Sequence, residues 1–221
     1  MCSVVIQQAA NVVVPHAVAD LDSFHDWMRS GDFPDSGRID FLAGELWIDM
    51  SEEQLFSHVR VKGEFCRVLS NVERDRGRGF YLVDGARVSH PEADLSAVPD
   101  GIFVLNESVQ TLKVQIVAGV GGYVRIEGGP DIVLEVVSDS SVQKDTVRLR
   151  NLYGKAGVRE YWLVDARREA PTFEILRRGE KGFVSTRKRD GWLMSSVLGT
   201  SFRLTQHTDP LGHPAFTLEM R

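Results

Sequence analysis

The sequence has only two cysteines and no long apolar run, and both absences exclude classes of protein. Cys2 and Cys66 lie far apart and match no metal-ligand spacing, so they define neither a disulfide framework nor a zinc site. No stretch approaches the roughly 20 apolar residues of a membrane-spanning helix, and the first residues lack the basic segment and apolar core of a signal peptide. We therefore expect a soluble, cytoplasmic protein in a reducing compartment.

The sequence also lacks an excess of positive charge. Its 26 Lys and Arg residues are outnumbered by 31 Asp and Glu residues, which gives a net charge of −5. Nonspecific adhesion to nucleic acid is not expected, so a nucleic-acid partner would need a local basic surface. One basic group flanks a predicted C-terminal hairpin: Arg177, Arg178, Lys181, Arg187, Lys188 and Arg189. A solvated hairpin is the default interpretation of this group, and a phosphate-binding surface is the alternative.

The apolar patterns predict a single α/β domain over residues 1–221. Residues 1–19 have no clear period and form either an N-terminal arm or an edge strand. Helical spacing begins after Asp20, a hairpin is expected at Ala43-Gly44, and Ser51 precedes a helix that runs to about Val72. Strands or hairpins are expected next at residues 80–83, 86–89, 97–105 and 106–128.

The stretch from Gly129 to Asp165 is expected to fold as strand, helix and strand. Ser140 and Gln143 have capping-box spacing at the start of the helix. The predicted buried stripe of this helix is Val142, Thr146, Leu149, Leu152/Tyr153 and Ala156. A βαβ crossover makes its two strands parallel neighbours. Short strands between residues 173 and 204 then extend the sheet or form a β-rich end.

Glu135 is the residue in this stretch that argues for a chemistry. It interrupts the apolar run Ile132–Val137, where a carboxylate is costly to bury without a partner. Asp100 stands at the mouth of another predicted strand. If the two strands pair, Asp100 and Glu135 can share a hard cation such as Mg²⁺ or Mn²⁺. A turn position for Asp100 and an arginine ion pair for Glu135 are the structural alternatives.

Several blocks of sequence together resemble the Uma2 family of restriction-endonuclease-like proteins, over about residues 20–205. They are Gly44-Glu45-Leu46, the helix that opens with His58, Val98-Pro99-Asp100, GPDIVLEVVSDSS, Asp145, Tyr153 and GVREYWLVD. The resemblance places the chain in the PD-(D/E)xK nuclease superfamily. It implies a restriction-endonuclease-like αβββαβ core, with a mixed central sheet flanked by helices and extra C-terminal strands. The implied activity is Mg²⁺-dependent hydrolysis of DNA phosphodiester bonds.

Carried over residue by residue, the resemblance makes Asp100 and Glu135 the metal-binding acids. Pro130-Asp131 is a second Pro-Asp pair, but Asp131 lies about 13 Å from Glu135 along one strand, so Asp100 is the better candidate. The superfamily lysine is absent, because Val137 stands two residues after Glu135. Leu149 stands at the other position where related sequences carry a lysine.

Lys144 is the candidate to replace the missing lysine in catalysis. It is expected on the helix face opposite Val142, from which a long side chain at the first turn can still reach the strand end. Further side chains are candidates to line the site: His58, Glu45, Gln143 and Arg148. The structural alternatives are an exposed helix position for His58 and the polar side of a hairpin for Glu45.

Two other functions fit the same residues. Without the motif lysine, the chain is alternatively a catalytically silent nucleic-acid-binding or assembly module on a nuclease fold. A metal-dependent hydrolase of a small phosphorylated substrate is the third option. We also expect a homodimer, because the exposed edges of a mixed sheet need cover.

Overall fold

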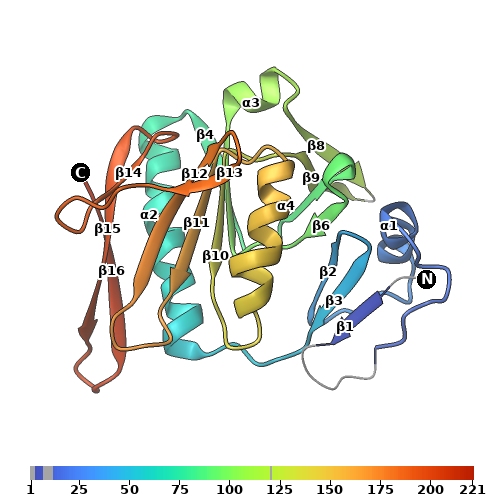
Figure 1. Cartoon of the computed structure of the whole chain (residues 1–221), viewed down its shortest axis with the longest axis horizontal. Helices are drawn as coiled ribbons and strands as arrows, with labels where there is room; N and C mark the ends of the chain where they lie inside the picture. The colour runs from blue at the N-terminus through green and yellow to red at the C-terminus, as the bar shows by residue number, and fades with distance from the viewer. Residues whose placement is uncertain (1–2, 7–11, 120) are drawn as a thin grey trace.

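A six-stranded mixed sheet lies at the centre of the computed structural model, which describes residues 3–6, 12–119 and 121–221 (Figure 1). Its strand order is β13-β12-β11-β10-β7-β4. The strands are β4 (Gly79–Val83), β7 (Gly101–Leu105), β10 (Ile132–Val136), β11 (Glu160–Asp165), β12 (Thr172–Gly179) and β13 (Gly182–Ser185). β10 and β11 are parallel, as predicted, and β7 is antiparallel to β10.

Two helices cover opposite faces of this sheet. The first is α2 (Arg60–Arg76), which packs Phe65 and Leu69 against β10 and β11. The second is α4 (Arg150–Lys155), whose Leu152 and Tyr153 pack against the other face. The order α2, β4, β7, β10, α4, β11 is the predicted αβββαβ core, and this prediction is confirmed.

A seven-stranded sheet lies on the α4 side of the core, toward the N-terminus in Figure 1. Its order is β1-β3-β2-β6-β5-β9-β8, with β1 (Ser3–Ile6), β2 (Arg38–Leu42), β3 (Glu45–Asp49), β5 (Arg87–His90), β6 (Leu95–Ala97), β8 (Val114–Gly119) and β9 (Gly122–Gly128). The expected β2–β3 hairpin is present, and its turn residues Ala43 and Gly44 both have positive φ. β1 lies at the sheet edge and pairs in parallel with β3.

Short helical segments connect these strands. Helix α1 (Leu21–Arg29) begins at Asp20, as predicted, and packs Phe24 and Trp27 onto the β2–β3 hairpin. A 3₁₀ turn, η2 (Pro91–Ala93), lies between β5 and β6, and α3 (Asn106–Gln110) follows β7. Within the part of the chain that the structure describes, no helix is long and apolar enough to cross a membrane.

A three-stranded C-terminal sheet packs over the far side of α2 (Figure 1). It contains β14 (Leu193–Ser195), β15 (Thr200–Thr208) and β16 (Pro214–Met220). Phe202, Phe216 and Leu218 join the same core cluster as the apolar face of α2. The predicted C-terminal strands therefore divide, because β12 and β13 extend the central sheet and β14 and β15 form this separate sheet. β16 is a strand that the sequence pattern did not predict.

The predicted start of the second helix is wrong by about three residues. The helical segment begins with a π-helical turn, η1 (Leu55–Val59), which leads into α2. Ser51 does not cap it, because its hydroxyl donates to Asp49, 2.5 Å away. The helix ends at Gly77, whose left-handed conformation closes the last turn.

The predicted cap of the third helix is also wrong. Ser138 and Ser141 exchange side-chain and backbone hydrogen bonds, while the Ser140 hydroxyl donates to Asp49. Gln143 is exposed and caps nothing.

The first half of the predicted buried stripe of this helix is incorrect. A π-helical turn, η3 (Lys144–Leu149), precedes α4. Val142 is exposed, whereas Lys144 and Asp145 are buried. The physical reason is that i→i+5 hydrogen bonding widens the turn and shifts which side chains share a face.

Candidate active site

Asp100 and Glu135 lie at the adjoining ends of two paired strands. The last register pair between β10 and β7 is Leu134 with Gly101, and Glu135 directly follows Leu134 while Asp100 directly precedes Gly101. The charge of Asp100 acts on Glu135 and raises its pKa, so the two carboxyl groups are near each other. Both side chains are buried, with 3% of Asp100 and 1% of Glu135 exposed.

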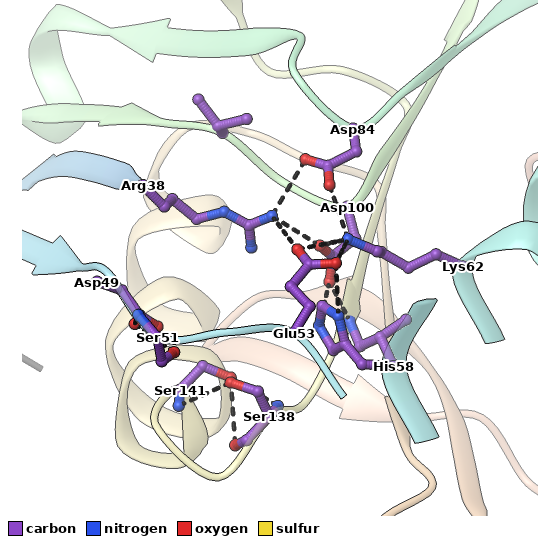
Figure 2. Close-up of polar contacts among 12 residues, drawn as sticks. Arg38, Asp49, Ser51, Glu53, His58, Lys62, Asp84, Asp100, Ser138 and Ser141 are labelled. Atoms are coloured by element: carbon purple, nitrogen blue, oxygen red, sulfur yellow. Dashed lines mark hydrogen bonds and ion pairs between the residues drawn. The ribbon is translucent and has the colours of Figure 1, made fainter. Parts of the chain in front are cut away.

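Asp100 is surrounded by positive side chains (Figure 2). Its Oδ1 lies 3.1 Å from a guanidinium nitrogen of Arg38 and 3.8 Å from Nζ of Lys62. Its Oδ2 accepts a hydrogen bond from the backbone N–H of Val136 at 2.7 Å and lies 3.6 Å from Nε2 of His58. The hydrogen bond from Val136 fixes Asp100 to the end of β10.

Two further acids, Glu53 and Asp84, balance the charges of these cations. Lys62 donates to Glu53 and to Asp84, at 2.6 and 2.7 Å, and Arg38 donates to Asp84 at 3.1 Å. Burial opposes the charge on Arg38, but Asp100 and Asp84 outweigh burial and raise the pKa of its guanidinium well above the ordinary value. Arg38 therefore stays charged beside Asp100.

A polar cavity of about 420 Å³ opens beside this network. Arg38, His58 and Asp84 line one part of its wall, and Asp49 and Ser138 line another. The cavity is therefore bordered by the hairpin β2–β3, the start of the α2 segment and the loop after β10. Arg38 lines this cavity together with the acids Asp49, Glu52, Glu53 and Asp84.

Glu135 has one satisfied and one unsatisfied oxygen. Its Oε1 accepts a hydrogen bond from the Tyr153 hydroxyl at 2.8 Å, whereas its buried Oε2 has no hydrogen-bond partner among the described residues. Burial raises the pKa of Glu135 well above the ordinary value, and the nearby charges of Asp145 and Asp100 raise it further. Burial and these neighbouring acids therefore favour the neutral form of Glu135.

Asp145 has the same character as Glu135. Its Oδ2 accepts a hydrogen bond from the Ser141 hydroxyl, and its buried Oδ1 receives no hydrogen bond from any described residue. Burial raises the pKa of Asp145 to about 7, against the opposing effects of Lys144 and Ser141. Asp145 faces inward because it belongs to the π-helical turn.

The residues present fit a divalent cation. Unsatisfied carboxylate oxygens in a buried acidic cluster are the ligands that Mg²⁺ and Mn²⁺ prefer. Among the described residues, no three His, Cys, Asp or Glu side chains are grouped closely enough to hold an ion by themselves. Water and substrate oxygens would therefore have to complete the coordination, as is usual for Mg²⁺.

Lys144 forms ion pairs with two buried acids, Asp40 and Asp145. It is buried, with 4% exposed, and its Nζ lies 3.2 Å from Asp40 and 4.0 Å from Asp145. Burial opposes the charge on Lys144, but Asp40 and Asp145 outweigh it and raise its pKa. Lys144 is therefore an internal counter-ion of the acidic cluster, and its predicted outward orientation is wrong.

The remaining sequence candidates separate into two groups. His58 lies at the cavity beside Asp100. Glu45 and Arg148 form an ion pair with each other and do not line this cavity. Gln143 is exposed on its helix.

Asp131, the alternative acid, has a structural role. Its oxygens accept hydrogen bonds from the backbone N–H of Leu105 at 2.8 Å and from the Ser108 hydroxyl at 3.0 Å, and Arg159 lies 3.3 Å away. Asp131 thus ties β7 and α3 to the start of β10.

Several site residues were not found from the sequence: Arg38, Asp40, Glu53, Lys62 and Asp84. One signal was present, because Lys62 lies four residues after His58 and therefore shares its helix face. No local pattern marked the other residues, which approach Asp100 or Lys144 from distant strands and loops.

Comparison with known proteins decides the family. A family model described as "Uma2: Putative restriction endonuclease" matches residues 21–206. The chain belongs to the Uma2 family. Among solved structures, this Uma2 chain is similar to "a putative nuclease belonging to DUF820" from Anabaena variabilis ATCC 29413, with a TM-score of 0.61. That match has 17% sequence identity and covers 81% of this chain and 90% of the other, so it shows a shared fold. No curated protein matches the chain.

Proposed function

We propose that this Uma2 protein is a Mg²⁺- or Mn²⁺-dependent endonuclease that hydrolyses phosphodiester bonds of DNA. The observation that carries the proposal is the placement of Asp100 and Glu135 just beyond the last register pair of β7 and β10, with the buried Oε2 of Glu135 receiving no hydrogen bond from any described residue. Membership of a restriction-endonuclease family supports the same reaction class.

Asp100 and Glu135 would hold the metal, with water and substrate oxygens completing its coordination. When bound, the ion supplies Lewis acidity and lowers the pKa of an attacking water. Arg38 lines the cavity and binds the phosphate, because a guanidinium suits paired phosphate oxygens. Lys62 replaces the missing motif lysine, since its ammonium lies 3.8 Å from Asp100. Val136 orients Asp100 through its backbone N–H.

One observation favours the second candidate, a catalytically silent nucleic-acid-binding module. Arg38 and Lys62 already neutralise Asp100, so internal cations provide part of what a metal would provide. Under this alternative the acidic cluster is a structural network.

Metal-dependent nicking of supercoiled plasmid, and cleavage of single-stranded DNA, tests the proposal. The variants Asp100→Asn and Glu135→Gln keep the size of each side chain and remove its charge. We expect each to lose activity on the order of 100-fold or more, because each removes a ligand of the essential ion. Glu219→Gln is the matched control, since Glu219 pairs with Arg203 on the C-terminal sheet.

Equal activity of the wild type, Asp100→Asn and Glu135→Gln would overturn the assignment. DNA binding by a wild type that neither cuts DNA nor binds Mg²⁺ or Mn²⁺ at millimolar concentration would favour the silent module. Hydrolysis of nucleotides but not of polymers would indicate a small phosphorylated substrate.

A homodimer and a cytoplasmic location remain predictions. β4, β8 and β13 are edge strands of their sheets, and exposed edges favour symmetric pairing. Sedimentation velocity tests the dimer, which requires a particle of twice the chain mass.

A further inference from the structure

Some cationic side chains of this protein form ion pairs with acids, and others do not. Those of the core, among them Arg38, Lys62 and Lys144, form ion pairs with nearby acids. Around the β12–β13 hairpin, by contrast, eight basic side chains form no ion pair within the described part of the chain: Arg150, Lys155, Arg177, Arg178, Lys181, Arg187, Arg189 and Arg221. A local excess of uncompensated positive charge therefore exists despite the net charge of −5.

These side chains line two cavities. The first, of about 500 Å³, contains Arg177, Arg187, Arg189 and Arg221 and no acidic residue. Trp192 forms part of its wall, and the Arg221 guanidinium lies 4.2 Å from the centre of the Trp192 ring. This contact fixes one guanidinium at the cavity wall.

The second cavity, of about 550 Å³, has a similar charge. It contains Arg150, Lys155, Arg178 and Lys181, with Glu180 as its one acidic residue. Arg150 is held in place by a hydrogen bond to the backbone carbonyl of Phe183 at 3.1 Å.

The two cavities lie on opposite faces of the hairpin. Arg177 and Arg178 are consecutive on β12, so their side chains point to opposite sides of the sheet. Side chains that leave opposite faces of one strand are separated on the order of 10 Å, which is close to the ~12 Å width of the major groove of B-DNA. Uncompensated guanidinium and ammonium groups at this separation suit phosphates on two strands of one duplex.

We infer that the β12–β13 hairpin and its two basic cavities form a binding surface for duplex DNA. The inference rests on the proposed function for the identity of the polyanion. The position of each site can be given along β11. Glu135 pairs in register with Leu163 of β11, whereas Arg177 pairs with Glu160 of the same strand. The basic surface is therefore distinct from the catalytic cavity. Those positions are about 10 Å apart along the strand at ~3.3 Å per residue, so one duplex turn of ~34 Å spans both sites.

Fluorescence anisotropy with a labelled 20-base-pair duplex, in EDTA to prevent cleavage, tests this inference. Two double variants each remove two charges, Arg187→Gln/Arg189→Gln from one cavity and Arg178→Gln/Lys181→Gln from the other. We expect each to weaken binding about tenfold and to lower the slope of log affinity against log salt by about 2. The matched control is Arg74→Gln/Arg78→Gln, which removes two exposed arginines near β4, at the opposite edge of the central sheet.

If both double variants bind the duplex as tightly as the control variant, the proposed binding surface is wrong. Loss of binding in only one of them would overturn the two-faced arrangement. Tighter binding of a single strand than of the duplex would overturn the choice of partner. A wild type that binds duplex DNA through this surface but never cuts it with Mg²⁺ or Mn²⁺ would refute the nuclease proposal alone. A wild type that cuts, with double variants that bind and cut equally well, would refute this surface alone.

Discussion

At the scale of single residues, the buried acids divide by the partners they have. Glu160 and Asp131 have their oxygens satisfied by several donors, whereas Glu135 and Asp145 each keep one buried oxygen that accepts no hydrogen bond within the described part of the chain. An unsatisfied buried carboxylate oxygen is costly to a folded protein. This difference separates acids that hold the fold together from acids that are available to a ligand.

Lys144 offers a test of that division. Lys144→Met is expected to destabilise the protein by about 3–5 kcal/mol, because it leaves Asp40 buried without its closest cation. The double variant Lys144→Met/Asp40→Asn is expected to recover much of this loss, since it removes both members of the pair. Urea unfolding measures both values. A Lys144→Met protein with wild-type stability and no nuclease activity would instead make Lys144 the catalytic lysine.

The sequence was informative about the central acids and uninformative about their neighbours. A carboxylate inside an apolar strand run is a local signal, and it identified Glu135 and the strand that carries it. Asp100 came from the Pro-Asp pair and the family resemblance. Arg38 and Asp84 approach Asp100 from 62 and 16 residues away in the chain, and no local pattern records such contacts.

At the scale of elements, the C-terminal sheet is held to the core through Glu160 of β11. This buried carboxylate accepts hydrogen bonds from the hydroxyls of Ser195 and Ser196, at 2.7 Å each, and from the indole N–H of Trp162. The backbone N–H of Val197 is a further donor. Glu160 therefore joins β11 to the connection between β14 and β15.

Glu160→Gln is expected to destabilise the protein by about 2–3 kcal/mol, because an amide N–H₂ then faces hydrogen-bond donors. Urea unfolding gives the free energy, and hydrogen exchange locates the effect in β15 and β16. Glu219→Gln is a suitable control, since its ion pair with Arg203 is exposed to solvent and contributes little to stability. A Glu160→Gln protein with wild-type stability and unchanged exchange in β15 would contradict this anchoring role.

Arg167 joins the end of β11 to the loop after β10, and its effect depends on pH. Its hydrogen bonds lower the pKa of Asp165 below the ordinary value, and it also pairs with Asp139 at 3.0 Å. A lowered folded-state pKa gives stability that is present above the unfolded-state pKa and is lost as pH falls through the folded value. Arg167→Gln should therefore cost about 0.5–1 kcal/mol at pH 7 and progressively less below about pH 4. Urea unfolding from pH 7 to pH 2.5 measures this, and a constant difference would contradict it.

The helical segments show what periodicity does not record. The helix from Asp20 was predicted correctly because its capping box and apolar face are local. The π-helical turns η1 and η3 were not, since five or six residues of i→i+5 winding leave no readable period. The winding of η3 turns Lys144 and Asp145 inward, and this is why their burial was missed.

At the scale of the whole molecule, three sheets and two helical layers position the acidic cluster. The αβββαβ core was expected from the family resemblance, and its βαβ crossover was predicted because such crossovers follow a general handedness and pairing rule. The division into separate sheets depends on nonlocal pairings, such as the parallel pairing of β5 with β9, that local patterns do not specify. The catalytic cavity forms where the N-terminal hairpin meets the end of β10, so it depends on those pairings.

The most direct test of the central claim is the anomalous scattering signal from a crystal soaked with Mn²⁺. We predict one strong peak in contact with Glu135 Oε2 and a carboxylate oxygen of Asp100. This peak should be absent from an identically soaked Glu135→Gln crystal. A soaked wild-type crystal with no peak at these oxygens, and with Asp100 still paired only with Arg38 and Lys62, would contradict it.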